Sequence, residues 1–199
     1  MNVIILGGFL GSGKTTALLQ LAKYLVGVSA PDREYKVVIL ENEVGQIGID
    51  DQYLRGSGFT VNNLFAGCAC CTVSGELVTA VDKIVRDMSP EWLIIETTGI
   101  AYPGLMRDNM KGALRLDSRV CVLADASRWR RLRVPMETLL RGQIECADFV
   151  LVNKIDLVDD DALESMELDI REFQLNVPIA RISALTEIPQ EVWKSAAGV

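Results

Sequence analysis

Residues 8–15 read Gly8-Phe9-Leu10-Gly11-Ser12-Gly13-Lys14-Thr15, which fits the pattern G-x-x-x-x-G-K-[ST] at every fixed position. A short apolar run, Asn2–Leu6, precedes this stretch, and a helix-compatible one, Lys14–Val26, follows it. In that order a strand, a glycine-rich loop and a helix bind phosphate, because backbone N–H groups converge on the oxygens and the helix N-terminus adds positive charge. We therefore predict that a nucleoside triphosphate binds to these residues: Gly11, Ser12, Gly13, Lys14, Thr15 and Thr16.

The rest of the chain alternates short, β-branched apolar runs with longer stretches that suit helices. Runs that are apolar almost throughout are typical of strands covered by helices on both faces. The expected strands are Asn2–Leu6, Lys36–Leu40, Trp92–Ile95, Arg119–Leu123, Phe149–Val152 and Pro178–Ile182. The expected helices are Lys14–Val26, Gly75–Met88, Pro103–Leu114, Met136–Cys146 and Asp159–Leu175. The alternation predicts the α/β class, with a P-loop fold in one domain over residues 1–199 and a mostly parallel sheet flanked by helices on both faces.

A second motif, at a later strand end, predicts which base is bound. Phe149–Val152 is followed by Asn153-Lys154-Ile155-Asp156. The Asp156 carboxylate can accept from N1–H and the 2-amino group of guanine, whereas adenine would leave it unpaired at a cost of about 1–3 kcal/mol or more. Lys154 can lie along the base plane, Asn153 can tie the loops together, and the segment Ser183-Ala184-Leu185 can donate a backbone N–H to guanine O6. The predicted ligands are therefore GTP and GDP rather than ATP.

The strand Trp92–Ile95 is followed by Glu96-Thr97-Thr98-Gly99. Glu96 would face Mg²⁺ together with the Thr15 hydroxyl, while the Gly99 N–H would sense the γ-phosphate and Lys14 would reach the β- and γ-phosphates. We assign the catalytic roles to Lys14 and Glu96. The alternative is that Glu96 only caps the next helix.

Residues 41–72 interrupt the alternation with many glycines and polar residues and end in the cluster Gly67-Cys68-Ala69-Cys70-Cys71-Thr72. Compact domains seldom keep so long an irregular connection unless it serves a site. Three thiolates on a tight turn can bind Zn²⁺, our first choice, or Co²⁺ or Ni²⁺, and leave a fourth position open. Glu41 and Glu43 are candidate oxygen ligands. The alternatives are a redox-sensitive cluster or simple packing, the role expected of Cys121 and Cys146.

Composition excludes several classes of function. The chain has 199 residues, a formal net charge of -7 and no histidine, so catalytic triads and metal sites that need imidazole are excluded. The acidic charge balance argues against nucleic-acid binding. No apolar run is long enough to span a membrane, and none resembles a leader, so we expect a cytoplasmic protein. Ser127–Arg133 is the one basic cluster; it is either a solvated face or a docking patch.

Together these motifs resemble the CobW-like branch of P-loop GTPases, which is related to UreG and HypB. The resemblance covers nearly the whole chain, and the C-x-C-C pattern downstream of a P-loop is its most specific feature. The stretches that carry it are G-G-F-L-G-S-G-K-T-T (7–16), E-N-E-V-G-Q-I-G-I-D (41–50), G-C-A-C-C-T (67–72), E-T-T-G (96–99) and N-K-I-D (153–156).

The resemblance implies a slow GTPase and metallochaperone that forms a nucleotide-dependent homodimer and serves a client metalloprotein or a corrinoid enzyme. By motif match, the metal role falls to Cys68, Cys70, Cys71 and Glu41, and the phosphate and Mg²⁺ roles to Lys14, Thr15 and Glu96. Gln46 replaces a glutamate common in the family, the histidine-rich tract is missing, and the usual C-terminal domain is expected to be absent. Two alternatives are a GTPase switch that assists a corrinoid (cobalamin) enzyme without transferring metal, and a small-molecule kinase, which the N-K-x-D motif disfavours.

Overall fold

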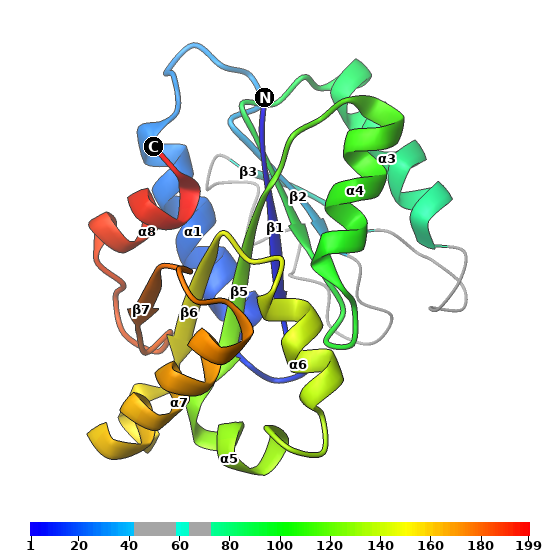
Figure 1. Ribbon diagram of the computed structural model, residues 1–199. Helices are drawn as coiled ribbons and strands as arrows, with labels where there is room; N and C mark the ends of the chain where they lie inside the picture. Colours follow the sequence, from blue (N-terminus) through cyan, green and yellow to red (C-terminus); the bar gives the residue numbers. More distant parts are fainter. Residues whose placement is uncertain (42–58, 64–72) are drawn as a thin grey trace.

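The computed structural model describes residues 1–41, 59–63 and 73–199, and within them one parallel sheet has the strand order β3-β2-β4-β1-β5-β6-β7 (Figure 1). Every neighbouring pair of strands runs parallel. The carboxyl ends of the strands therefore lie on one edge of the sheet, where α/β proteins bind ligands. The strands are β1 (Asn2–Gly8), β2 (Val37–Glu41), β3 (Phe59–Asn63), β4 (Trp92–Glu96), β5 (Arg119–Asp125), β6 (Phe149–Asn153) and β7 (Ile179–Arg181).

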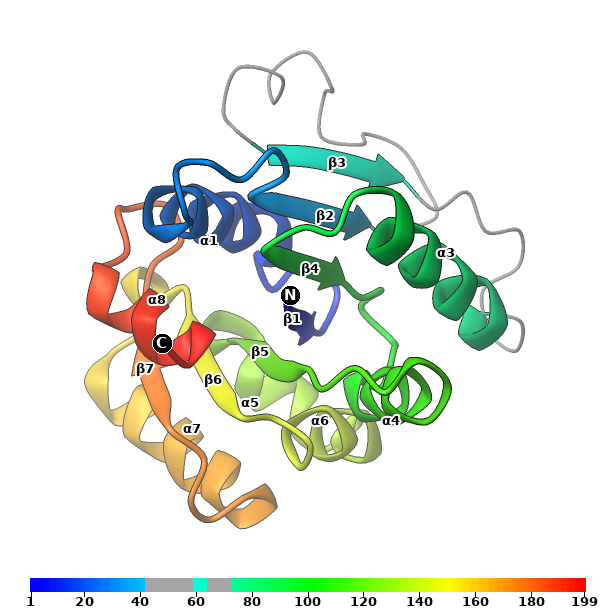
Figure 2. The same cartoon turned by 90° about the horizontal axis from the view of Figure 1, so that it is seen from above.

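Helices cover both faces of this sheet, as the view from above in Figure 2 shows. One face carries α1 (Lys14–Val28) and α8 (Gln190–Ala197). The opposite face carries α3 (Val73–Asp87), α4 (Pro103–Leu114), α6 (Glu137–Ile144) and α7 (Asp160–Phe173). Shorter pieces are α5 (Trp129–Leu132) and the 3-10 turns η1 (Ala126–Arg128) and η2 (Ile155–Leu157). The predicted α/β architecture is confirmed.

The apolar strand sequences arise from the two-sided burial of the sheet. Successive side chains of a strand point to opposite faces. In β1, Val3 and Ile5 belong to one core cluster, and Ile4 and Leu6 to the other. Each such side chain contributes about 1.5–3 kcal/mol by burial, so both faces select apolar residues.

Local signals place the helix ends that matter for the site. α4 begins with Pro103, whose fixed φ suits the first turn and whose missing N–H has no helical partner there in any case. α7 begins after Asp159, whose side chain accepts from Ala162 N at 2.8 Å. Both helices thus start where the chain has just left the ligand-binding edge.

All six predicted strands and all five predicted helices are present, with ends within two residues of the expected positions. The prediction that residues 41–72 are irregular throughout is wrong at 59–63, which form the edge strand β3 beside β2. Its sequence F-T-V-N-N is short and only partly apolar, so it lacks the continuous run of a central strand. The helices α5 and α8 were not predicted either, since each is too short to show a clear period.

Cys121 is fully buried in β5, and burial raises the pKa of its thiol to about 12. Cys146 is half-buried after α6, and its Sγ donates to the carbonyl of Gln143 at 3.1 Å. Both cysteines pack in the core, as predicted. None of the helices in the described ranges combines the length and hydropathy needed to cross a bilayer.

Candidate functional site

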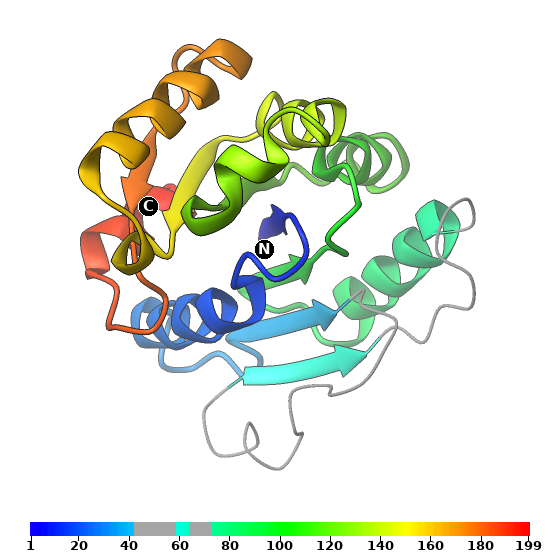
Figure 3. The same cartoon turned by 90° about the horizontal axis from the view of Figure 1, so that it is seen from below.

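The loop between β1 and α1, residues 9–13, is called the phosphate loop below. It lies at the carboxyl edge of the sheet, which Figure 3 views from below. Gly8, Gly11 and Gly13 all have positive φ, at 135°, 69° and 95°. These conformations favour glycine and let successive N–H groups face a bound phosphate. Lys14 begins α1 and is buried, and its Nζ donates to the carbonyl oxygens of Gly8 at 3.1 Å and Phe9 at 3.4 Å. The lysine charge therefore lies directly against the loop.

Gly13 leaves the room that Asn153 needs, because a Cβ at position 13 would lie 2.4 Å from Asn153 Nδ2. In that space Nδ2 donates to Ser12 O at 2.8 Å. Oδ1 accepts from the N–H groups of Lys154 at 2.8 Å and Ala184 at 2.9 Å. The buried amide thus joins three loops, which is the tying role that the sequence predicts for Asn153.

Replacing Asn153 with Ala should lower the free energy of unfolding by about 1–3 kcal/mol, because buried polar groups in all three loops lose their partner. Urea unfolding followed by circular dichroism measures the difference. The matched control is Asn176→Ala, on an exposed turn, which should change stability by less than about 0.5 kcal/mol. Equal stability of the two variants would contradict the role given to Asn153.

Glu96 ends β4 and is 2% exposed, and its Oε1 accepts from Thr15 Oγ1 at 3.0 Å. A carboxylate and a hydroxyl beside a phosphate loop are the donors that Mg²⁺ takes in nucleotide sites, so the residues fit that ion. Glu96 does not cap the next helix, which was the alternative role. The N-cap of α4 is Tyr102, and it makes no side-chain hydrogen bond.

Glu41 ends β2 in register with Glu96 on the neighbouring strand. Adjacent strands are about 4.8 Å apart, so the backbone of Glu41 lies next to the Thr15–Glu96 pair. The remaining predicted metal ligands, Cys68, Cys70, Cys71 and Glu43, lie outside the described residues. Within the described ranges, no cluster of three or more His, Cys, Asp or Glu side chains could hold a metal ion.

Gly99 packs directly on the phosphate loop. A Cβ at position 99 would lie 2.5 Å from Leu10 N and 2.7 Å from Leu10 Cα. From the other side, the buried Gln143 of α6 donates through Nε2 to the carbonyls of Gly99 at 3.2 Å and Ala101 at 2.9 Å. The turn that is predicted to sense the γ-phosphate is therefore held between the loop and α6.

The segment predicted to read guanine, residues 153–156, contacts the phosphate loop as well. Lys154 has a φ of 65°, and its Nζ donates to Gly11 O at 2.8 Å. Asp156 follows in η2, with an exposed side chain. Because Asn153 engages the Ala184 N–H, the exposed Leu185 is the better source of the predicted donor to guanine O6.

Asp125, at the end of β5, is a residue that sequence reasoning missed. Its carboxylate is buried and accepts from Lys154 Nζ at 2.8 Å, Arg128 Nε at 2.7 Å and Ser127 Oγ at 2.6 Å. Burial alone would raise the pKa of Asp125, but the hydrogen bonds from Lys154, Ser127 and Arg128 lower it below its ordinary value. The available signal was an acid at the carboxyl end of a buried strand, the same signal that identified Glu96.

The basic segment Ser127–Arg133 is only partly a solvated face. Arg133 pairs with Glu172 at 2.8 Å and lies 4.4 Å from the centre of the Phe173 ring, so it fastens the segment to α7. Arg128 points toward the phosphate loop. Arg130 and Arg131 are exposed on α5. Two of its four arginines thus serve internal contacts.

Known proteins resemble this chain in sequence. The zinc chaperone YjiA of Escherichia coli is 30% identical over 168 residues, which cover 79% of this chain and 50% of that protein. The zinc-regulated GTPase metalloprotein activator 1 of Schizosaccharomyces pombe is 32% identical over 177 residues, which cover 81% of this chain and 40% of that protein. The chain thus spans about half the length of the curated relatives it matches.

Solved structures share the fold. HypB from Helicobacter pylori in complex with nickel gives a TM-score of 0.66 at 20% identity and covers 100% of this chain and 84% of that chain. The Zn(II)-bound YjiA GTPase from Escherichia coli gives 0.66 at 21% identity and covers 100% of this chain and 62% of that one. A family model described as the CobW/HypB/UreG nucleotide-binding domain matches residues 2–181. With nine-tenths of its length inside that match, the chain belongs to the CobW/HypB/UreG family.

Proposed function

We propose that this chain binds and hydrolyses GTP and couples its nucleotide state to a metal held by Cys68, Cys70, Cys71 and Glu41, for delivery to a client metalloprotein or a metallocofactor pathway. The observation that carries the proposal is that the phosphate loop and the guanine-reading loop are directly hydrogen-bonded, through Lys154 Nζ to Gly11 O and Asn153 Nδ2 to Ser12 O. One guanine nucleotide can therefore engage both loops at once. Residues 1–199 act as one GTPase domain in this proposal.

Hydrolysis follows from the charges that surround the γ-phosphate. Water attacks the γ-phosphorus, the bond to the β–γ bridging oxygen breaks, and GDP and phosphate leave. Lys14 lies where its ammonium can stabilise the charge that develops on the phosphoryl oxygens. Thr15 and Glu96 would hold Mg²⁺, which neutralises the phosphate oxygens when bound. Slow hydrolysis is part of the proposal, as the resemblance to the CobW-like GTPases implies.

Chain length and topology support the link between nucleotide and metal. β3 ends at Asn63, on the same edge as Glu41, its register partner. Cys68 is five residues beyond Asn63 in the sequence. β4 is only two strands from β3, about 10 Å away. A change at the Thr15–Glu96 pair therefore arises within two strands of Asn63, from which the chain continues to the cysteines.

The relatives' names point to zinc as cargo. A solved Zn(II)-bound YjiA variant has alanine in place of one glutamate and two consecutive cysteines, so zinc binds that protein even without those residues. A test on this chain must therefore count metal ions rather than detect binding alone.

Replacing Cys70 with Ser should remove one high-affinity Zn²⁺ per chain, because three thiolates hold the ion and two do not complete the site. Anaerobic titration against a chromophoric chelator measures the stoichiometry. Cys146→Ser is the matched control. The Cys146 thiol donates to a backbone carbonyl, a contact that a serine hydroxyl can also make, so this variant should bind as much zinc as the unchanged chain. An unchanged zinc stoichiometry in Cys70→Ser would favour the alternative, a GTPase switch that serves a corrinoid enzyme without carrying metal.

Coupling adds a reciprocal check on the same protein. If a GTP analogue with Mg²⁺ tightens zinc binding by a given factor, zinc must tighten binding of the analogue by the same factor, about 5–150-fold for ordinary allosteric pairs. Equal affinity for the analogue with and without zinc would contradict the coupling while leaving GTP binding intact. The same samples, run on a sizing column, test the proposed nucleotide-dependent homodimer.

A further inference from the structure

Arg128 contacts the phosphate loop from behind, at three consecutive residues. Its Nη2 donates to the carbonyl of Leu10, and its guanidinium lies 5.8 Å from the centre of the Phe9 ring. A Cβ at Gly11 would lie 3.2 Å from the same Nη2. In such loops the N–H groups face the phosphates, so a cation on a carbonyl acts on the outer side of the loop.

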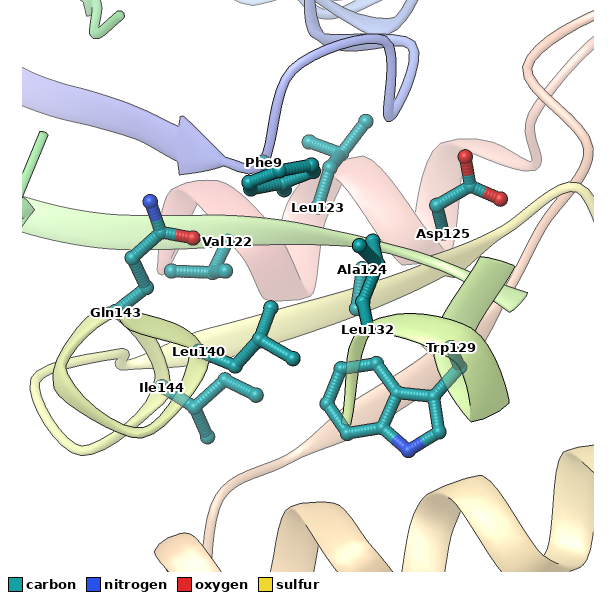
Figure 4. Close-up of a pocket in the computed structure, with 10 residues that line it drawn as sticks. All are labelled: Phe9, Val122, Leu123, Ala124, Asp125, Trp129, Leu132, Leu140, Gln143 and Ile144. Atoms are coloured by element: carbon teal, nitrogen blue, oxygen red, sulfur yellow. The ribbon is translucent and has the colours of Figure 1, made fainter. Parts of the chain in front are cut away.

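This arginine is fixed in place. Its Nε donates to Asp125 Oδ2 at 2.7 Å, and that carboxylate is 1% exposed. The planar guanidinium can therefore bridge Asp125 and Leu10 at once, which a lysine ammonium cannot do with the same geometry. Figure 4 shows Phe9 at the end of β1, over β5, with Leu140 and Ile144 of α6 on the far side of the pocket that they line.

Leu10 links Arg128 to the Gly99 turn, which is predicted to sense the γ-phosphate. Its carbonyl is held by Arg128, while its N and Cα pack against Gly99 at a distance that excludes any side chain there. Gln143 anchors Gly99 from the opposite side. With Gly99 anchored by α6, the position of the Leu10 peptide sets how the Gly99 N–H meets a third phosphate.

We propose that Arg128 is a positioning residue that gives the site its preference for GTP over GDP, by holding Leu10 against Gly99. The inference rests on the proposed function. GDP lacks the γ-phosphate and uses the later part of the loop, residues 11–15, where Lys154 supports the Gly11 carbonyl. Loss of Arg128 therefore weakens the contacts to the third phosphate and spares those to the first two.

The test measures Kd for a non-hydrolysable GTP analogue and for GDP by calorimetry with Mg²⁺, on the unchanged chain and on Arg128→Met. We expect the analogue to bind about tenfold more weakly and GDP to change by less than about twofold, since the one charge-assisted hydrogen bond from Arg128 to the Leu10 carbonyl is lost. Arg128→Lys should give an intermediate ratio, about threefold. Arg130→Met removes the same charge two residues away, on an exposed position, and should change neither affinity.

Three results would overturn the inference. Equal weakening of the analogue and GDP would make Arg128 a general support of the loop, and unchanged affinities would leave it without a role. If a thermal scan shows that Arg128→Met does not fold, the test uses Arg128→Lys instead, and the ratio of its affinities for the analogue and for GDP gives the answer. Failure of the unchanged chain to bind either nucleotide would overturn the proposed function as well, so the two failures are distinguishable.

Discussion

Lys14→Met should lower the rate of GTP hydrolysis by at least about 100-fold, the usual cost of removing one preorganised donor to a developing negative charge. The side chain is 4% exposed, and its Nζ lies on the carbonyls of Gly8 and Phe9. Met has a similar length and suits a buried position, so the variant removes the charge and keeps most of the packing. Phosphate release under single-turnover conditions measures the rate.

A matched control separates this effect from a general loss of positive charge. Lys23 lies on the same helix, α1, and is exposed, so Lys23→Met should hydrolyse GTP at the unchanged rate. A thermal scan of both variants checks that the fold is intact. Hydrolysis by Lys14→Met within about threefold of the unchanged chain would contradict the assignment of Lys14, because an ammonium at the β- and γ-phosphates cannot be that dispensable.

The sequence was most informative where one physical requirement dominates. Central strands buried on both faces must be apolar throughout, so β1, β4, β5 and β6 could be placed to within two residues. The edge strand β3 has only one neighbour, β2, and its F-T-V-N-N sequence could not be distinguished from a loop. Periodicity over eight residues was likewise too weak to predict α8, although Trp193 is buried in its core cluster.

The motifs identified the residues of the nucleotide site but not the contacts among them. That Asn153 ties loops together was predicted from its place in N-K-x-D, and the structure shows that it joins three of them. That Asp125 joins Lys154 to Arg128 was not predicted, because Lys154 comes from a separate segment and meets Asp125 only when β5 and β6 are paired. The burial of Gln143 could not be predicted for a similar reason. A polar residue on an amphipathic helix is expected to be exposed, but Gln143 is buried because it donates to two carbonyls of another segment. The cysteine cluster lies outside the described residues, so its metal role stays a prediction.

Asp156→Asn should exchange the base specificity of the site, weakening GTP binding by at least about 100-fold and favouring xanthosine triphosphate. A carboxylate accepts two hydrogen bonds from guanine, and each such bond to a charged group contributes about 1.5–3 kcal/mol. Xanthine carries a carbonyl at C2 instead of the amino group, so it repels a carboxylate and accepts from an amide N–H. The side chain lies exposed in η2, directly after the loop that Lys154 and Asn153 fix, so the exchange alters the contact to the base and little else.

The informative measurement is the ratio of the two affinities rather than either one alone. Competition with a fluorescent nucleotide should give a ratio that favours GTP in the unchanged chain and xanthosine triphosphate in the variant. Asp159→Asn makes the same charge change three residues away, at the N-cap of α7, where Asn caps as well as Asp, and should leave the ratio unchanged. Equal loss of both nucleotides in Asp156→Asn would mean that the carboxylate supports the loop and does not read the base. A preserved affinity for GTP would mean that the base binds elsewhere, because an amide N–H facing the 2-amino group of guanine cannot replace the lost acceptor.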